Sequence, residues 1–304
     1  MSYQLIHGDC LEVMPTLESG SVDAIICDLP YGTTSCHWDS VIPFHEHITF
    51  KSKTYTKDEF YLYMARHEYS REEIDAIWSD GKRDGLWENY KRIIKPRGAI
   101  VLFGSQPFTS ALIMSNTEWF KYCWVWKKDK ATGHLNALIQ PMADYEDIAV
   151  FGEGGIRYYP QVEPKQKENI RPLSRRAPTD SYGKYNEQAE RLIPLDMSFP
   201  KRILNFPTTN HGERGYHPTQ KPVSLLRYLL RTYTAEGEII LDNTMGSGST
   251  IVAAIQEGRN AIGIERDADY FTIAQQRCLE ATYQPSLFAP QPTQWEPVAM
   301  FGDD

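Results

Sequence analysis

A short string, Asp28-Leu29-Pro30-Tyr31, directly follows an apolar run at residues 24–27. The amino group of a nucleobase is a poor nucleophile because its lone pair is delocalised into the ring, so its alkylation needs acceptors for the N–H bonds. The carboxylate of Asp28 and the main-chain carbonyl of Leu29, held by the following proline, can supply two acceptors. The ring of Tyr31 can stack on a base that has left a duplex. The string therefore predicts chemistry on an exocyclic amino group.

The segment 241–250, LDNTMGSGST, predicts a ligand-binding turn between a strand and a helix. The strand is expected to end at Asp242, and Gly246 and Gly248 would let a ligand approach the backbone closely. A pyrophosphate site needs a third glycine for close helix packing, and this chain has Ile251 at that position. The segment fits either a ligand without a pyrophosphate or a turn with a purely structural role.

A further acidic residue favours the ligand site. Glu265 follows Asp242 by 23 residues, at the carboxyl end of the next expected strand, where a carboxylate can bind ribose hydroxyls. Ser249 and Thr250 would begin the helix beside that ligand. S-adenosylmethionine is the common ligand that has a nucleoside and no phosphate, so we predict it as the cofactor.

Strands and helices alternate along most of the chain, which predicts an α/β fold with a largely parallel sheet and helices on both faces. The expected strands cover residues 24–27, 99–104, 122–128, 147–152, 238–243 and 260–267, and the expected helices cover residues 86–98, 223–234, 249–258 and 268–281. Pro96 and Gly98 are expected to stop the first of these helices.

Residues 44–85 interrupt this pattern and predict a helical hairpin. Two capping boxes, Thr56 with Glu59 and Ser70 with Glu73, each precede a run with helical spacing. The insertion has seven Lys/Arg and nine Asp/Glu residues, a balance that favours a cover over the core rather than a DNA contact. Both roles stay open.

Residues 153–215 have weak periodicity and predict a substrate-specific insertion. Within 155–215 there are eleven Lys/Arg and seven Asp/Glu residues, a net charge of +4 in a chain whose net charge is −8. A basic segment on an acidic body can form one surface that faces DNA, and a solvated loop is the alternative. The candidate DNA-binding residues are Arg157, Arg171, Arg175, Arg176 and Lys184.

The composition is that of an ordinary soluble globular protein: 304 residues, 41% hydrophobic and 24% charged. We expect no membrane partner, because there is no apolar run long enough for a membrane span and no signal peptide. The five scattered cysteines, without CxxC spacing, indicate free thiols in a reducing cytoplasm. No cluster of histidine, cysteine and carboxylate residues has ligand spacing, so no metal is expected.

The order of these motifs resembles that of the permuted β group of DNA amino-methyltransferases, over residues 4–280. In that family the catalytic tetrapeptide comes first, then a target-recognition region, then the cofactor motif. Here these correspond to DLPYG at 28–32, the basic stretch at 153–215 and the segment 217–267. The resemblance implies the Rossmann-like fold of S-adenosylmethionine-dependent methyltransferases, with one antiparallel strand in its sheet.

The resemblance also implies how the chain is divided. The expected parts are a catalytic half at 1–152 that contains the 44–85 insertion, a target-recognition region at 153–215, a cofactor-binding half at 216–282 and a flexible tail at 283–304.

Further site residues follow from the same resemblance. HGDCLEVM, which begins at His7, is similar to the family's GD motif and would place Asp9 at the adenine end of the cofactor. HPTQKP, which ends at Pro222, would place Thr219 and Lys221 near the methionine moiety. Asp28 would serve both the catalytic site and the cofactor site.

Two positions depart from the family's pattern. Leu29 stands where the family usually has proline, but the expected role is that of a main-chain carbonyl, which any residue supplies. Asn243-Thr244 stand where the family usually has Pro-Phe, which changes the packing expected around the methionine moiety.

The expected reaction is the site-specific methylation of the N6 amino group of adenine in a flipped-out base. In the resembled family an acid at the first tetrapeptide position, here Asp28, favours adenine and a serine favours cytosine, so cytosine N4 is the alternative. Methylation of cytosine C5 needs a cysteine nucleophile, usually after proline, and the chain has no Pro-Cys pair. The permuted order weighs against RNA or protein substrates. The alternative of another class is a non-catalytic DNA-binding protein with a relic methyltransferase fold.

The resemblance implies DNA as the partner, a cytoplasmic location in a bacterium, an archaeon or a phage-infected cell, a link to restriction–modification and, in some members, a homodimer. The tail carries QPSLF at Gln284–Phe288, which is similar to the pentapeptide that docks bacterial replication proteins on the sliding clamp. Leu287 and Phe288 would be its apolar anchors, and a tail that packs on its own domain is the alternative.

Overall fold

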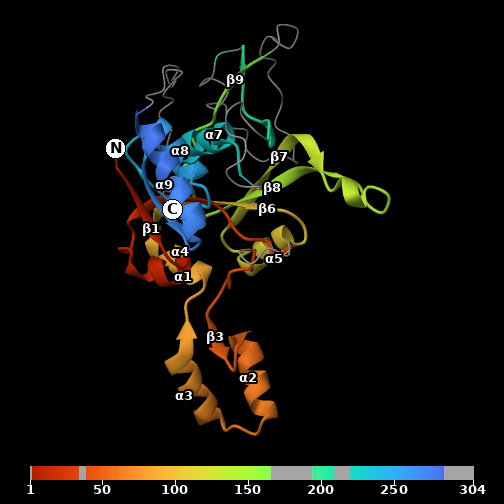
Figure 1. Cartoon of the computed structure of the whole chain (residues 1–304), viewed down its shortest axis with the longest axis vertical. Helices are drawn as coiled ribbons and strands as arrows, with labels where there is room; N and C mark the ends of the chain where they lie inside the picture. The colour runs from red at the N-terminus through yellow and green to blue at the C-terminus, as the bar shows by residue number, and fades with distance from the viewer. Residues whose placement is uncertain (1, 34–38, 166–193, 195, 209–219, 284–304) are drawn as a thin grey trace, which may run out of the picture.

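The computed structural model describes residues 2–33, 39–165, 194, 196–208 and 220–283. Their arrangement is drawn in Figure 1. Within these residues no helix is both long and apolar enough to cross a membrane.

An eight-stranded sheet forms the centre of the body, in the order β1-β13-β12-β2-β6-β8-β7-β11. Its strands are β1 (Tyr3–His7), β2 (Val22–Asp28), β6 (Ile94–Gly104), β7 (Phe120–Thr132), β8 (Ala143–Phe151), β11 (Ile203–Asn205), β12 (Ile239–Asp242) and β13 (Asn260–Glu265). All neighbours are parallel except at β8, which is antiparallel to both β6 and β7. The prediction of a mostly parallel sheet with one reversed strand is confirmed.

Helices cover both faces of this sheet. They are α1 (Cys10–Val13), α4 (Leu86–Ile93), α5 (Phe108–Ser115), α7 (Val223–Tyr233), α8 (Ser249–Gln256) and α9 (Ala268–Tyr283). The central strand β2 is buried on both sides because its residues alternate between two cores. Ala24 and Ile26 pack with α7, α8 and α9, whereas Ile25 and Cys27 pack with α1, α4 and α5. Shorter elements are η1 (Met14–Thr16), η2 (His134–Asn136), β9 (Glu163–Pro164) and β10 (Met197–Ser198).

The helix predicted at 86–98 is shorter than expected. It ends at Ile93, and β6 begins at Ile94, before the proline that was expected to stop the helix. The residue before a proline is pushed out of the helical region, so Lys95 adopts the extended conformation and the strand takes over early.

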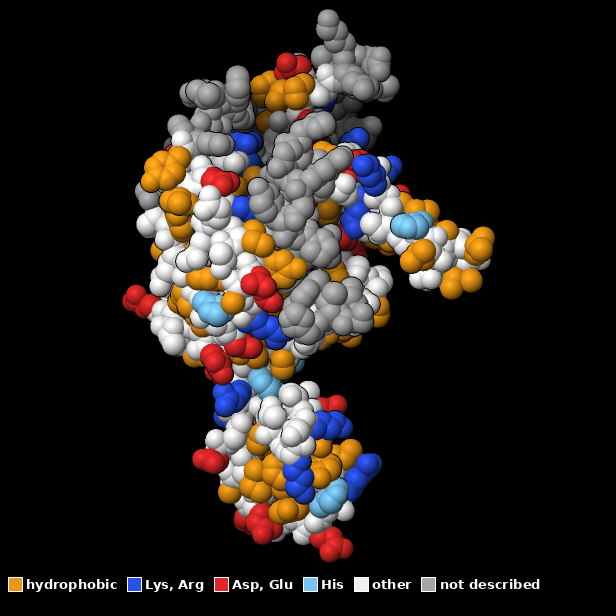
Figure 2. Space-filling model, in the orientation of Figure 1, with side chains coloured by type: hydrophobic (Ala, Val, Ile, Leu, Met, Phe, Trp, Pro, Cys, Tyr) orange, Lys and Arg blue, Asp and Glu red, His pale blue; other side chains and the backbone are white. Residues whose placement is uncertain are grey.

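The strands β7 and β8 continue beyond the sheet as a hairpin arm. Figure 2 shows this arm leaving the body, with hydrophobic side chains at its tip. Among these, Leu135, Leu138 and Ile139 are exposed. At the base of the arm, Trp126 and Ile148 lie in the core, so the same two strands join the arm to the body.

The insertion at 44–85 forms a small separate lobe, which projects from the body in Figures 1 and 2. It contains β3 (His47–Phe50), β4 (Lys53–Thr56), α2 (Lys57–Arg66), α3 (Arg71–Gly81) and β5 (Lys82–Arg83). Both predicted capping boxes are present, so the two helices are confirmed. The three-stranded sheet was not predicted, because strands of two to four residues leave almost no pattern in a sequence. The lobe has its own core, made of Ile48, Tyr55, Phe60, Met64, Ile74 and Trp78.

Replacing residues 47–83 by a short glycine–serine linker should leave the body folded. The lobe's core is separate from the two cores beside the main sheet, and His47 lies opposite Arg83, so the cut ends are close. We expect one cooperative thermal transition within a few degrees of that of the full chain, measured by circular dichroism. Phe60→Ala in the full chain is the matched control: it should unfold only the lobe, because emptying a buried aromatic site costs about 3–5 kcal/mol. A truncated chain without a cooperative transition would show that the body depends on the lobe.

Candidate active site

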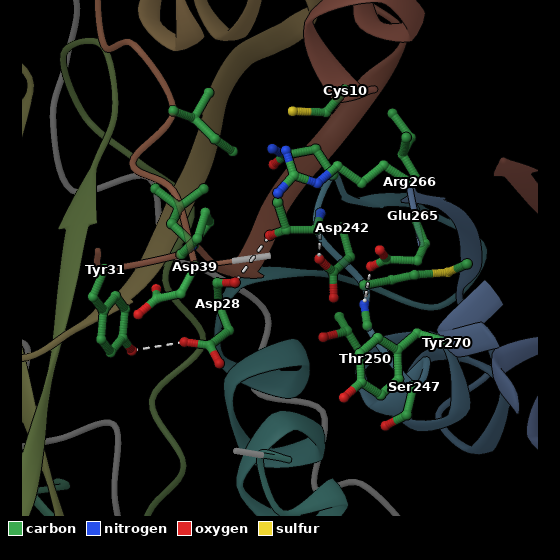
Figure 3. Close-up of a pocket in the computed structure, with 18 of the residues that line it drawn as sticks. Cys10, Asp28, Tyr31, Asp39, Asp242, Ser247, Thr250, Glu265, Arg266 and Tyr270 are labelled. Atoms are coloured by element: carbon green, nitrogen blue, oxygen red, sulfur yellow. Dashed lines mark hydrogen bonds between the residues drawn. The ribbon is translucent and has the colours of Figure 1, made fainter. Parts of the chain in front are cut away.

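A cavity of about 280 Å³ opens where the carboxyl ends of four neighbouring parallel strands meet (Figure 3). Its walls come from the residues that follow β1, β2, β12 and β13, at 8–11, 28–31, 242–247 and 264–266. Ligands of open α/β sheets bind at this edge, outside the carboxyl ends of the strands. The sheet therefore brings together three motifs that are far apart in the sequence.

Glu265, at the end of β13, is held rigidly at one end of the cavity. One carboxylate oxygen accepts a hydrogen bond from the amide of Gly246 at 2.9 Å, and the other accepts one from the amide of Asp267 at 2.8 Å. Burial raises the pKa of Glu265, and these backbone donors oppose the rise. Each oxygen keeps a lone pair, so the carboxylate can still accept further hydrogen bonds.

Asp242, at the end of β12, is almost fully buried beside Glu265. Its Oδ1 accepts a hydrogen bond from the amide of Thr244 at 3.2 Å. Burial raises the pKa of Asp242 from 3.8 to about 7, although a hydrogen bond with Thr250 opposes the rise. A buried carboxylate that still carries negative charge near neutral pH can stabilise a cationic ligand group.

The glycine turn supports this site in two different ways. Gly246 lines the cavity with a φ of 51°. Gly248 does not line the cavity; it has a φ of 81°, and a Cβ there would lie 3.0 Å from the Cβ of Ala274. It therefore lets α8 approach α9 rather than letting a ligand approach the backbone, which differs from our expectation. The predicted residues Ser249 and Thr250 do line the cavity.

Asp9 lies in the cavity wall, where the resemblance to the GD motif placed it. Its side chain also caps α1, because Oδ1 accepts a hydrogen bond from the amide of Leu11 at 2.8 Å. The cap fixes the carboxylate close to the end of β1.

Asp28 is at the opposite end of the cavity, and all its polar groups are engaged. Its Oδ1 accepts a hydrogen bond from the hydroxyl of Tyr31 at 2.7 Å, and its Oδ2 accepts one from the ammonium of Lys221 at 2.5 Å. Its main-chain carbonyl accepts a bond from the hydroxyl of Thr244 at 3.0 Å. Burial raises the pKa of Asp28, and the ammonium of Lys221 opposes the rise.

The two departures from the family pattern are explained by these contacts. Thr244, where the family usually has an aromatic residue, links the turn after β12 to the end of β2. Leu29 buries its side chain in the core of α1, α4 and α5, which holds the main chain of the tetrapeptide in place. Leu29 and Pro30 both line the cavity.

Tyr31 packs against the protein in this structure. Its ring lies 5.1 Å from that of Phe108, measured between centroids, and its hydroxyl is bonded to Asp28. The loop that follows is closed by Asp39, whose carboxylate accepts hydrogen bonds from the amides of Gly32 and Thr33 at 2.8 and 2.9 Å. Asp39 was not identified from the sequence, because an isolated loop aspartate carries no signal.

Two charged residues beside Lys221 were also missed. Glu146 of β8 lies 3.3 Å from the ammonium of Lys221 and 2.6 Å from that of Lys128, on β7. Both positions fall in strands whose alternation is typical of any half-exposed hairpin, so nothing in the sequence distinguishes them. Only the pairing of β7 with β8 brings them together.

The remaining predicted site residues do not line the cavity or lie outside the described part of the chain. Arg157 forms ion pairs with Asp23, at 3.4 Å, and with Glu238, so its charge is balanced within the protein. We therefore exclude it from the proposed DNA contacts. Thr219, Arg171, Arg175, Arg176, Lys184 and the tail motif Gln284–Phe288 lie outside the described residues. Within the described ranges, no group of three or more histidine, cysteine or carboxylate side chains could hold a metal ion.

The sheet with one reversed strand and the cavity at its carboxyl edge define the class of Rossmann-like methyltransferase folds. The chain belongs to the DNA methylase family of N6 and N4 methyltransferases, whose family model matches residues 22–276. This membership confirms the resemblance drawn from the motif order.

Individual relatives agree with this assignment. The chain is 25% identical over 295 residues to the type II methyltransferase M.HindIII of Haemophilus influenzae, covering 90% of this chain and 94% of that protein. It is 25% identical over 291 residues to the type II methyltransferase M.HinfI of the same species, covering 93% and 70%.

Solved structures share the fold. The M1.HpyAVI–SAM complex has a TM-score of 0.51 at 22% identity, with 90% of this chain and 98% of that chain covered. The cytosine-N4-specific PvuII DNA methyltransferase has a TM-score of 0.55 at 14% identity, with 95% and 89% covered. The predicted methyltransferase fold is confirmed.

Asp242→Asn should stabilise the ligand-free protein at pH 8 but much less at pH 5. Its pKa of about 7 in the folded protein exceeds its ordinary value of 3.8, so its contribution to stability is fully present below pH 3.8 and is lost as the pH rises through 7. The neutral amide avoids burying a negative charge, which corresponds to a gain on the order of 2 kcal/mol at pH 8. Urea denaturation at the two pH values measures this difference. An equal loss of stability at both would contradict the assignment of a costly buried charge.

Proposed function

We propose that this protein is a site-specific DNA methyltransferase that transfers a methyl group from S-adenosylmethionine to the N6 amino group of adenine. The observation that carries the proposal is the position of Asp28. Its carboxylate lines the same cavity as Glu265 and Asp242, so one cavity contains both an acceptor for an amino group and a site for a nucleoside.

The cavity fits the proposed cofactor. In this proposal Glu265, held by two backbone amides, accepts hydrogen bonds from the ribose hydroxyls. Asp9 in the cavity wall meets the adenine end, and Asp242 binds the cationic amino group of the methionine moiety. One structural neighbour, M1.HpyAVI, was solved as a complex with SAM, which supports this choice. When bound, the cofactor supplies a methyl group on a sulfonium, which is already activated for transfer.

The residues of the chain then orient the substrate. Asp28 and the Leu29 carbonyl accept the N–H bonds of the target amino group, which directs its nitrogen lone pair at the methyl carbon. In this structure the Tyr31 hydroxyl donates to Oδ1 of Asp28, and the incoming amino group shares this oxygen or replaces the hydroxyl on it. Tyr31 is then free to stack on the flipped base. Lys221 stays on Oδ2, and the proton lost from the amino group leaves to solvent or through Asp28.

The assignment of adenine as the target base rests on the sequence and not on the fold. It comes from the acid at the first tetrapeptide position, whereas one structural neighbour with the same fold is cytosine-N4-specific. We propose that the segment 153–215 supplies the target-recognition contacts to DNA, and docking of the sliding clamp by Gln284–Phe288 stays a prediction.

Incubating unmethylated DNA with the protein and S-adenosylmethionine should yield N6-methyladenine, detected by mass spectrometry of the nucleosides. Asp28→Ala should lower the rate by at least about 100-fold, because a preorganised acceptor is lost. Glu18→Ala, at an exposed carboxylate outside the cavity, is the control with unchanged rate. N4-methylcytosine would overturn the base assignment, and no methylated base would overturn the proposal.

Tyr31→Phe and Tyr31→Ala separate the hydroxyl of Tyr31 from its ring. The phenylalanine variant keeps the stacking surface and vacates Oδ1 of Asp28, so we expect an equal or lower KM for DNA and a kcat within a few-fold of wild type. The alanine variant loses a base-stacking contact worth about 1–3 kcal/mol, so its KM should rise roughly 5- to 150-fold. Steady-state kinetics would contradict the stacking role if the two variants were equally impaired.

A further inference from the structure

Four charged side chains form a continuous row that ends at Asp28. Lys128 lies 2.6 Å from Glu146, Glu146 lies 3.3 Å from Lys221, and Lys221 lies 2.5 Å from Asp28. The charges alternate in sign along the row. Their side chains are 11%, 13%, 6% and 27% exposed in that order, so the row is largely buried.

Burial makes the balance of this row important. Charges removed from water are costly unless each is paired, and their mutual interactions are stronger than at a surface. Burial alone would raise the pKa of Glu146, but Lys221 and Lys128 outweigh it and lower the pKa. Burial alone would lower the pKa of Lys221, but Asp28 and Glu146 outweigh it and raise the pKa. These contacts therefore favour the charged forms of Glu146 and Lys221.

Within the row, the ammonium of Lys221 contacts two carboxylates, those of Asp28 and Glu146. Glu146 and Asp28 bind it from different strands, and the rings of Phe103 and Tyr31 lie 5.4 and 5.8 Å from its nitrogen. Because Glu146 shares the ammonium, Asp28 is not closed into an exclusive ion pair and keeps the capacity to accept a substrate N–H. Because Lys128 neutralises Glu146, Lys221 is not drawn away from Asp28.

We propose that Lys128 and Glu146 are positioning residues that act through Lys221 to set the charge and orientation of Asp28. The proposal rests on the function proposed above, in which Asp28 accepts the target amino group. Glu146 lines the cavity, but Lys128 does not, so Lys128 lies outside the walls that would surround the reacting base. We therefore assign its effect on the reaction to the row.

The alternating charges predict the direction in which each substitution changes the pKa of Asp28. Lys128→Gln leaves one excess negative charge, draws Lys221 toward Glu146 and raises the pKa of Asp28. Glu146→Gln leaves one excess positive charge and lowers it. The double variant is neutral again and should return the titration of Asp28 close to that of wild type. Among the residues that the structure describes, the other titratable groups around Asp28 are Tyr31, Cys27 and Asp242, and all three are unchanged in these variants.

The direct test is a carbon-13 NMR titration of Asp28 in the full chain, without substrate, with aspartate labelled at the carboxyl carbon and Asp28→Asn used for assignment. We expect Lys128→Gln to move the Asp28 titration upward by about half to one pH unit. Lys128→Arg should titrate as wild type, and Lys128→Gln/Glu146→Gln should restore the midpoint. Single-turnover methylation should follow the same order, with a rate for Lys128→Gln that is slower on the acidic side of the Asp28 midpoint and recovers on the alkaline side.

The outcomes separate this proposal from the proposed function. An unchanged Asp28 titration in Lys128→Gln, with only a lower melting temperature, would overturn the positioning role while methylation by wild type stands. The expected NMR shifts in a wild-type protein that methylates no DNA would overturn the function while the coupling along the row stands. If Lys128→Gln does not fold, the comparison of Glu146→Gln with the double variant decides the question: Glu146→Gln should lower the Asp28 midpoint, and adding Lys128→Gln should return it to that of wild type. Equal midpoints in these two variants would overturn the role of Lys128.

Discussion

The Asp28 carboxylate is largely buried at the end of β2, and burying a charge is costly unless neighbouring groups compensate it. Lys221 supplies the opposite charge, Tyr31 supplies a hydrogen bond, and Thr244 fixes the backbone carbonyl of the same residue. The catalytic end of the cavity is therefore built around one acceptor. In the proposed mechanism Asp28 must also bind a substrate amino group, and it does not hold Lys221 exclusively, because Glu146 shares that ammonium.

The sheet makes this arrangement possible by joining distant parts of the chain. Asp28 and Lys221 are 193 residues apart in sequence, and Asp28 and Thr244 are 216 apart. Because β12 pairs in parallel with β2, the turn after one strand meets the tetrapeptide after the other. The next strand, β13, adds Glu265 at the same edge, so Glu265 and Asp28 line one cavity.

The sequence alone predicted those site residues whose position depends only on their neighbours in the chain. A carboxylate at the end of an apolar run, as at Asp28, Asp242 and Glu265, marks a strand end by itself. The partners of these residues depend on tertiary contacts: Glu146 meets Lys128 only because Trp126 lies opposite Glu146 in the β7–β8 pair. Periodicity in the sequence could not predict the short strands of the inserted lobe, for the same reason. Nor could it predict that Gly248 serves the packing of α8 on α9.

A crystal structure of the protein with S-adenosylmethionine tests most directly whether one cavity joins a nucleoside site to an amino-group acceptor. We expect the ribose hydroxyls within hydrogen-bond distance of Glu265 and the methyl group directed toward Asp28, with the amino group of the methionine moiety at Asp242. A cofactor that binds elsewhere, or that turns its methyl group away from Asp28, would contradict the proposed division of the cavity and with it the proposed reaction.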